Sequence, residues 1–304
     1  MTNLHTRRFG PLKGILASLP AFRGKHQMID AAAKVARKLC GDVQEIQLWP
    51  GTRFCVDLRD RVHRQMWFAS YEPHVTQALS AILRPGDTFL DVGAHIGYHS
   101  VFAAGIVGPE GRIFAFEPDP KVHARLASNL APFANARALP CAVSDRQTQM
   151  EFERSWDCQE SGWGALTSVR DFKKGEHIAV QAVSLDSWCE KSDVRAIRAV
   201  KIDAEGSEGT VLRGAQRVLR SFRPVLCIEF NEALLKQARE TGKALMDMLS
   251  ANLYCVHELS FRGLRRLTGA APEFADCLCI PEESLREVLQ LLRNRGFEID
   301  HSRD

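Results

Sequence analysis

The sequence predicts a doubly wound α/β fold, in which helices cover both faces of a mostly parallel β-sheet. From residue 87 onward, short apolar segments typical of strands alternate with longer segments of helical period. The first of these strands runs into the small residues Gly93, Ala94 and Gly97, directly before a predicted helix. Acidic residues follow several of the other predicted strands, at the edge where open α/β sheets bind their ligands.

The first 70 residues are predicted to form a separate extension. Apolar residues recur every three or four positions over 26–40, which predicts a helix. Residues 45–48 and 53–58 alternate apolar with polar side chains on either side of a Pro-Gly pair, which predicts a β-hairpin. The extension is therefore expected to contain one helix and one hairpin.

Residues 71–304 are predicted to form the main domain, beginning with a helix over 71–83. The predicted strands cover residues 88–92, 112–117, 136–143, 200–203, 225–230, 254–258 and 277–281. The predicted helices cover residues 98–107, 120–131, 208–221 and 232–251. The segment 151–175 lacks a regular period but holds two tryptophans, so we expect an ordered lid or an insertion on the acceptor side.

Composition argues against several classes of protein. Forty Lys and Arg against thirty-seven Asp and Glu, without a block of like charges, disfavour a nucleic-acid partner. Nine scattered cysteines without a C-x-x-C motif argue against a zinc ribbon or a disulfide framework, and fit reduced thiols. The apolar stretch 14–22 is broken by Pro20 and is too short to span a membrane. We expect a cytoplasmic protein.

The turn after the strand 88–92 is the predicted cofactor site. Gly93, Ala94 and Gly97 allow a ligand to approach the backbone closely, and the following helix offers free N–H groups. The spacing G-x-x-x-G is not the dinucleotide pattern, and Asp91 adds a negative charge where a pyrophosphate would lie. An acid suits a cationic ligand. S-adenosylmethionine, with its sulfonium and α-ammonium groups, is the predicted cofactor.

The next two strands are predicted to complete the nucleotide site. Glu117 ends the second strand, where a carboxylate can accept hydrogen bonds from both ribose hydroxyls, and Asp119 follows it closely. Ser144 and Asp145 follow the third strand, where the adenine edge would be bound. An acid at a strand end and a Ser-Asp turn are also ordinary surface features, so both alternatives stay open.

Acidic residues after the strand 200–203 are the predicted catalytic groups. Asp203 and Glu205 lie at the strand end, in the crevice where the cofactor is expected. Glu208 either caps the following helix or takes part in function. Methyl transfer to oxygen relies on holding the acceptor close to the methyl group, and the acceptor hydroxyl loses its proton to a base or beside a metal.

Either a general base that takes this proton or a metal that lowers the pKa of the acceptor hydroxyl would assist the reaction. Asp203, Glu229 and Asn231 form an all-oxygen set suited to Mg²⁺ or Mn²⁺, which resembles the arrangement in metal-assisted catechol methyltransferases. The same oxygens can instead bind substrate hydroxyls. The candidate bases are the histidines near the crevice, which are His74, His95 and His99. His74 is the predicted catalytic histidine.

Taken together, the motifs resemble those of the FkbM-type methyltransferases. The resemblance spans residues 70–230 and rests on Tyr71-Glu72-Pro73, Asp91-Val-Gly-Ala-His-Ile-Gly97, Phe116-Glu117-Pro118, Leu185-Asp186 and Val200-Lys-Ile-Asp203-Ala-Glu205-Gly206-Ser-Glu208. It implies a class I methyltransferase sheet with a late antiparallel strand. It also implies methyl transfer to a hydroxyl of a sugar, polyketide or similar small molecule, and a contact of Glu72 with the cofactor. His95 stands where the family often has Asn.

Other functions remain open at this stage. An NAD(P)-dependent Rossmann-fold oxidoreductase would use the same sheet, although the glycine spacing and Asp91 disfavour it. A non-catalytic methyltransferase-like binding module is a second alternative, because a fold does not establish an activity. Methylation of a protein or RNA is a third. We expect a small-molecule or glycan acceptor; its identity and the oligomeric state are not predicted.

Overall fold

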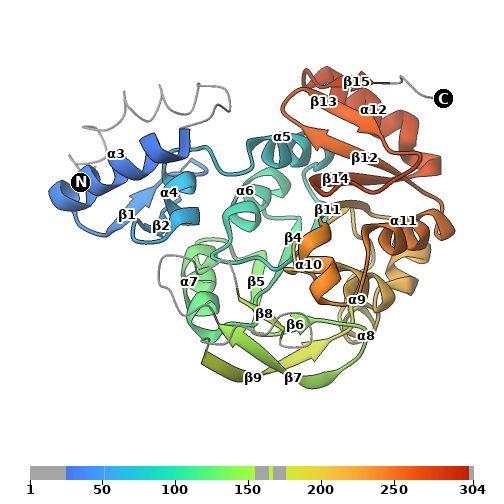
Figure 1. Ribbon diagram of the computed structural model, residues 1–304, viewed down its shortest axis with the longest axis horizontal. Coiled ribbons are helices and arrows are strands. Elements are labelled where there is room, and N and C mark those ends of the chain that lie inside the picture. Colours follow the sequence, from blue (N-terminus) through green and yellow to red (C-terminus); the bar gives the residue numbers. More distant parts are fainter. Residues whose placement is uncertain (1–24, 51, 155–163, 167–175, 301–304) are drawn as a thin grey trace. The chain divides into compact units, whose positions relative to one another are not determined.

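The structure is a computed structural model that describes residues 25–50, 52–154, 164–166 and 176–300. Contacts between residues divide the chain into two compact units, of which the first contains described residues 25–73 and the second contains described residues 74–300 (Figure 1). The predicted division into an extension over 1–70 and a main domain over 71–304 stays a prediction. No helix in the described part of the chain is long and apolar enough to cross a membrane.

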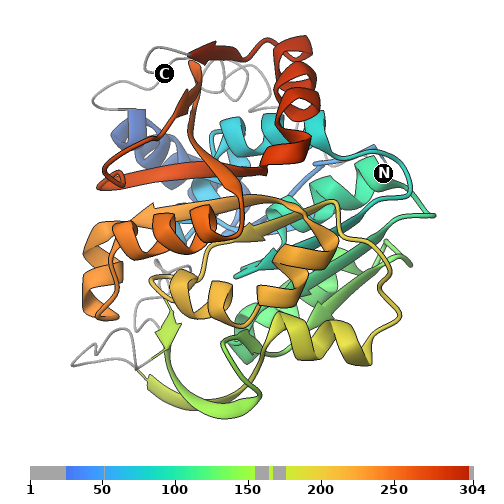
Figure 2. The same cartoon turned by 90° about the vertical axis from the view of Figure 1, so that its right-hand side faces the viewer.

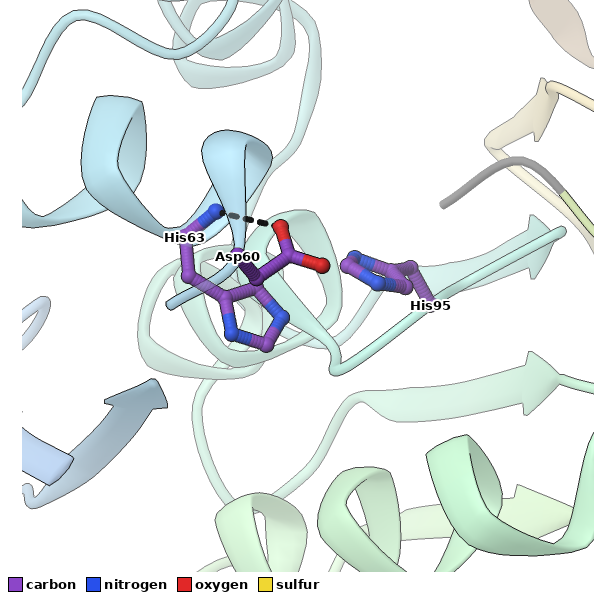
Figure 3. Close-up of side chains that lie close together, drawn as sticks. All are labelled: Asp60, His63 and His95. Carbon is purple, nitrogen blue, oxygen red and sulfur yellow. Dashed lines mark hydrogen bonds between the residues drawn. The ribbon is translucent and has the colours of Figure 1, made fainter. Parts of the chain in front are cut away.

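The first unit contains the predicted helix and hairpin. The helix is α3 (Lys25–Cys40), and the antiparallel pair is β1 (Val43–Ile46) with β2 (Phe54–Asp57). A short helix, α4 (Arg61–Trp67), follows and was not predicted. Asp60 caps α4, because its Oδ1 accepts the N–H of His63 at 3.1 Å (Figure 3) and the N–H of Val62 at 2.8 Å.

The second unit is built on a nine-stranded sheet in the order β15-β13-β12-β14-β11-β10-β3-β4-β5. Its strands are β3 (Thr88–Val92), β4 (Arg112–Phe116), β5 (Ala136–Leu139), β10 (Ala199–Ile202), β11 (Val225–Asn231), β12 (Tyr254–Ser260), β13 (Gly263–Arg266), β14 (Phe274–Pro281) and β15 (Glu298–Asp300). The five strands from β11 to β5 are parallel, and β14 runs antiparallel between β11 and β12. This is the predicted class I methyltransferase sheet with its late antiparallel strand.

Helices cover both faces of this sheet (Figures 1 and 2). One face packs against α8 (Leu185–Lys191), α9 (Glu208–Arg213), α10 (Glu232–Gln237) and α11 (Gly242–Ala251). The opposite face packs against α5 (Pro73–Ile82), α6 (Tyr98–Val107) and α12 (Leu285–Asn294). Side chains alternate between the two faces along each strand, so Leu90 belongs to the first core and Phe89 to the second.

Two predicted helices are interrupted. The prediction over 208–221 is replaced by α9 and a π-helix (Val218–Phe222), separated near Gly214, where an added Cβ would lie 2.1 Å from the carbonyl oxygen of Ser144. The prediction over 232–251 is replaced by α10 and α11, because Thr241 caps a new helix start. Close packing at the first break and capping at the second override helical periodicity.

A second sheet, ordered β6-β9-β7-β8, was not predicted. It consists of β6 (Ala142–Val143), β7 (Thr148–Arg154), β8 (Ala165–Leu166) and β9 (Glu176–Val183). The strand predicted over 136–143 is therefore divided between two sheets. Part of the segment 151–175, predicted to be irregular, is strand: β7 reaches Arg154, and β8 follows. Residues 155–163 and 167–175 lie outside the described residues.

Candidate active site

One face of the large sheet becomes polar toward the carboxyl ends of its parallel strands. This face begins with apolar residues such as Phe89 and Ala199, against which α5, α6 and α12 pack. Two residues further along, at Asp91 and Lys201, the side chains are charged. We refer to five of them as the polar row: Asp91, Lys201, Asp203, Glu229 and Asp276.

The strand register brings the polar row together. Asp91 on β3 lies beside Lys201 on β10, and Glu229 on β11 lies beside Asp276 on β14. Asp203 directly follows β10, and its N–H donates to the carbonyl of Val92 at 3.0 Å. Because β14 is antiparallel, its first residues reach the edge at which the parallel strands end. The polar row thus joins four strands.

The glycine turn beside this row is shaped by close packing. Gly93 has a φ of +75°, and a Cβ added to it would lie 1.8 Å from the carbonyl oxygen of Asp203. Gly97, with a φ of +89°, begins α6, and an added Cβ would lie 2.6 Å from Leu126. Both glycines are required by conformation and by space inside the protein. Ala94, between them, is buried, and its N–H donates to Phe116.

Asp91 is a buried carboxylate with one oxygen left without a partner. Its Oδ2 accepts a hydrogen bond from the Ser100 hydroxyl at 2.5 Å, whereas its Oδ1 has no partner among the described residues. Burial raises the pKa of Asp91, and the neighbouring Lys201 opposes that rise. A buried acceptor without a partner is costly, so this oxygen is suited to a cationic or hydrogen-bond-donating ligand.

Glu117 follows β4 and faces the same turn. Its Oε2 accepts the N–H of His95 at 3.1 Å, and its Oε1 accepts the N–H of Asp119 at 2.9 Å. Burial raises the pKa of Glu117 to about 8, although these two hydrogen bonds oppose the rise. The backbone therefore fixes the orientation of a buried carboxyl group, which suits it to accept paired hydroxyl groups of a ligand.

The other predicted nucleotide contacts are engaged in local structure. Asp119 caps α7 (Pro120–Leu130) by accepting the N–H of Lys121, and its two oxygens also bind Arg154 at 2.9 and 3.0 Å. Ser144 is buried, and its hydroxyl lies 3.4 Å from the carboxylate of Asp145. Glu72 belongs to the first unit. The binding roles of these residues remain predictions.

Asp203 forms an ion pair within the polar row. The Lys201 Nζ donates to Asp203 Oδ2 at 2.7 Å, and the Lys201 side chain is only 4% exposed. Burial, and then the charges of Asp203 and Glu205, raise the pKa of Glu229 to about 10. The surroundings of Glu229 therefore favour its neutral form, and the Lys201 ammonium group partly balances the negative charge of the neighbouring acids.

Glu205 and Glu208 lie in the turn that connects β10 to α9. Glu205 is half-buried and adopts a left-handed φ of +50°, directly before Gly206. Glu208 accepts the N–H groups of Ala204 and Gly206 at 2.9 and 3.2 Å through Oε1. Its Oε2 has no partner among the described residues, and burial raises the pKa of Glu208 to about 7. Glu208 therefore holds the turn that carries Glu205.

His74 is paired with an acid of the polar row. Its Nε2 lies 2.7 Å from Asp276 Oδ2, and its Nδ1 is buried without a partner among the described residues. If Asp276 accepts the Nε2 proton, Nδ1 keeps a free lone pair. The other two candidates differ: the backbone of His95 binds Glu117 from the turn after β3 (Figure 3), and His99 is buried in α6 beside Asp91.

Two of the three predicted magnesium or manganese ligands are engaged in other interactions. Asn231 caps α10, because its Oδ1 accepts the N–H of Leu234 at 3.4 Å. Asp203 is already paired with the ammonium group of Lys201, which would repel a divalent cation. Capping and ion pairing therefore compete with metal binding, and the metal site stays a prediction.

Sequence reasoning missed three charged residues of this region, which are Lys201, Asp276 and Arg154. The first two interrupt apolar strands, and a charge within a buried strand was a signal that could have singled them out. Arg154 gave no comparable signal, because its partner Asp119 lies 35 residues away in the sequence.

Comparisons with known proteins agree with this arrangement. The model of the FkbM methyltransferase domain matches residues 91–299. The chain is 27% identical to the 2-O-methyltransferase NoeI of Sinorhizobium fredii over 57% of this chain and 75% of NoeI. It is 28% identical to the hexuronic acid methyltransferase AglP of Haloferax volcanii, over 51% of this chain and 61% of AglP.

A third relative gives the same result. The 31-O-demethyl-FK506 methyltransferase FkbM of Streptomyces tacrolimicus is 31% identical over 44% of this chain and 61% of that protein. The match therefore covers less than two thirds of AglP and of FkbM. The family match overturns the oxidoreductase alternative, in agreement with the buried acid at Asp91. The chain belongs to the FkbM family of S-adenosylmethionine-dependent methyltransferases.

Proposed function

We propose that this protein transfers a methyl group from S-adenosylmethionine to a hydroxyl of a saccharide or a similar small molecule. The observation that carries the proposal is the polar row beside the glycine turn, in which buried carboxyl groups face the edge where open α/β sheets bind ligands. The names of NoeI and FkbM specify O-methylation, and the name of AglP specifies a hexuronic acid.

Two buried acids support the cofactor assignment. The unpartnered Oδ1 of Asp91 is suited to the positively charged amino-acid part of S-adenosylmethionine, and Glu117 is suited to its ribose hydroxyls. When bound, the cofactor supplies a methyl group on a sulfonium, which is released as a thioether while the acceptor oxygen gains the methyl group and loses its proton. In the proposal, Ala94, Ser144 and Asp145 complete the part of the cofactor site that lies in the second unit.

His74 is the group best placed to take the acceptor proton. Asp276 holds its Nε2, so the proton would move to Nδ1 and the resulting imidazolium would be stabilised by the Asp276 carboxylate. Asp203 is less suitable as a base, because its Oδ2 already accepts a hydrogen bond from the Lys201 ammonium group at 2.7 Å. Asp203 instead is proposed to orient the acceptor hydroxyl, and Glu205 to line the same crevice.

The test is a methyl-transfer screen over neutral sugars, uronic acids and polyketide alcohols, with mass detection. For an acceptor found in this way, His74→Gln is expected to lower kcat by about 100-fold or more. The affinity for S-adenosylhomocysteine, measured by calorimetry, should stay unchanged. The control is His177→Gln, because His177 is partly exposed on β9.

Two outcomes would contradict the proposal. A wild-type protein whose melting temperature does not rise with S-adenosylhomocysteine would refute the cofactor assignment, because a ligand that binds the folded state raises stability. Methylation only of amines, thiols or carbon would refute the hydroxyl acceptor. Full turnover in His74→Gln would remove His74 from the mechanism but would leave the transfer to oxygen intact.

A further inference from the structure

Two exposed phenylalanines lie directly beside the polar row. Among the described residues of the second unit, the exposed large apolar side chains are Leu253, Phe261 and Phe274. Phe261 is 65% exposed in the turn between β12 and β13, and Phe274 is 66% exposed at the start of β14. Single exposed apolar residues are common, so their position relative to the site has to decide whether they matter.

The strand register places both phenylalanines next to the catalytic edge. Phe274 precedes Asp276 by two residues and so lies on the same face of β14, opposite Asn231 on β11. The last β12–β14 pair is Leu259 with Asp276, and Phe261 follows Leu259 by two residues, in the turn after β12. Phe274 therefore lies on the face of the polar row, and Phe261 lies just beyond the end of the strand that pairs with Asp276.

Phe261 also contacts the proposed base. Its ring lies 5.0 Å from the imidazole of His74, measured between centroids, with the two rings tilted by 58°. An apolar ring against the imidazole limits the access of water to one side of the base. A molecule that lies against Phe261 would therefore also lie beside His74.

We propose that Phe261 and Phe274 form the platform on which the apolar face of the acceptor's sugar ring lies. This inference rests on the proposed function, which places the acceptor at the same edge. A pyranose ring has a face of C–H groups and a rim of hydroxyls, so it fits flat aromatic surfaces bordered by hydrogen-bond acceptors. Asp276 and Asn231 border the platform in this way.

Charge at the platform favours a neutral sugar over a uronic acid. The carboxylates of Asp91, Asp203 and Asp276 lie on this face, with Lys201 as the lysine within the polar row. A carboxylate on the acceptor would be repelled by these acids, and the repulsion would be stronger at low ionic strength. The platform is therefore expected to select neutral rings.

The experiment uses the full-length protein with saturating S-adenosylhomocysteine. The probes are methyl β-D-glucopyranoside, methyl β-D-galactopyranoside, methyl α-D-mannopyranoside and methyl β-D-glucuronide, followed by saturation-transfer NMR. The wild-type protein is expected to bind at least one neutral glycoside, with the strongest saturation transfer to the ring protons on one face. It is expected to bind the glucuronide at least about tenfold more weakly than this glycoside.

Four variants test the residues. Phe261→Ala and Phe274→Ala are each expected to weaken binding of the neutral glycoside about tenfold, because loss of one stacking ring costs about 1–3 kcal/mol. Phe261→Tyr should restore binding, because it keeps the flat ring, whereas Phe261→Leu should not. The control is Leu253→Ala, since Leu253 is 58% exposed and precedes the opposite end of β12.

Several results would overturn the platform. Alanine variants that bind the glycoside as tightly as the wild type would remove both residues from acceptor recognition, and rescue by Phe261→Leu would reduce the role of that residue to packing. Absence of binding of every neutral glycoside, or equal binding of the glucuronide, would refute the assigned ligand. If Phe261→Ala and Phe274→Ala methylated an acceptor from the methyl-transfer screen as fast as the wild type, the platform would be overturned while the proposed function stands.

Discussion

Replacement of the buried Glu117 by glutamine is expected to change the stability of the protein in opposite directions at low and high pH. The pKa of Glu117 is raised by burial to about 8 from an ordinary value of 4.5. The folded protein thus retains a proton between these two values that the unfolded chain loses. The contribution of this proton to the free energy of unfolding is fully present below about pH 4.5 and is lost as the pH rises through about 8.

The size of this loss follows from the two pKa values. The interval from 4.5 to about 8, at ~1.4 kcal/mol for each pH unit, corresponds to ~5 kcal/mol lost by pH 9. Glutamine removes that loss. It introduces an opposing cost of about 1–3 kcal/mol, because its amide NH₂ would face one of the backbone N–H groups of His95 and Asp119. At pH 9, the stabilisation gained by removing the buried charge exceeds the cost of the amide group that faces a backbone N–H. At pH 5, the wild-type carboxyl carries no charge, so only the cost of the amide group remains.

Urea unfolding at both pH values tests this reasoning. Glu117→Gln is expected to be about 1–2 kcal/mol less stable than the wild type at pH 5, and about 2–4 kcal/mol more stable at pH 9. The control is Glu110→Gln, because Glu110 is exposed and should give parallel curves. A difference between Glu117→Gln and the wild type that stays constant with pH would refute the assignment of a buried, protonated Glu117.

Three further changes have defined outcomes. Gly93→Ala is expected to cost about 3 kcal/mol or more in urea unfolding, because its Cβ would lie 1.8 Å from the Asp203 carbonyl. Gly86→Ala, with a φ of +88° and open space, should cost about 1 kcal/mol, and equal costs would contradict this packing. Asp276→Asn should lower kcat about 100-fold and leave S-adenosylhomocysteine affinity unchanged, and unaltered kcat would disconnect it from His74. EDTA should leave turnover unaffected. If EDTA abolished turnover and added Mg²⁺ restored it, the result would support the predicted metal site.

Local patterns predicted the secondary structure around the glycine turn well. The bounds of β3 and α6 agree with the predictions over 88–92 and 98–107, because an apolar strand and the glycine turn mark both ends clearly. Asp91 and Glu117 also lie in the predicted turn region. These features depend on residues close together in the sequence, which is why one sequence was sufficient.

The acceptor side could not be predicted in the same way. Asp276 reaches His74 only because β14 inserts antiparallel between β11 and β12, and no local pattern encodes that pairing. The competing interactions of the predicted metal ligands could not be predicted for a related reason. The ion pair of Asp203 with Lys201 depends on a lysine two residues earlier that was read as part of a buried strand, and the capping role of Asn231 competes with metal binding.

The residues proposed to bind the methyl donor and those proposed to bind the acceptor lie in different parts of the chain. The groups assigned to the methyl donor follow β3 and β4, whereas Phe261, Phe274 and Asp276 all belong to the hairpin-like segment formed by β12, β13 and β14. Substitutions within this one carboxy-terminal stretch are therefore expected to change the proposed acceptor platform and leave the residues assigned to the methyl donor unaltered.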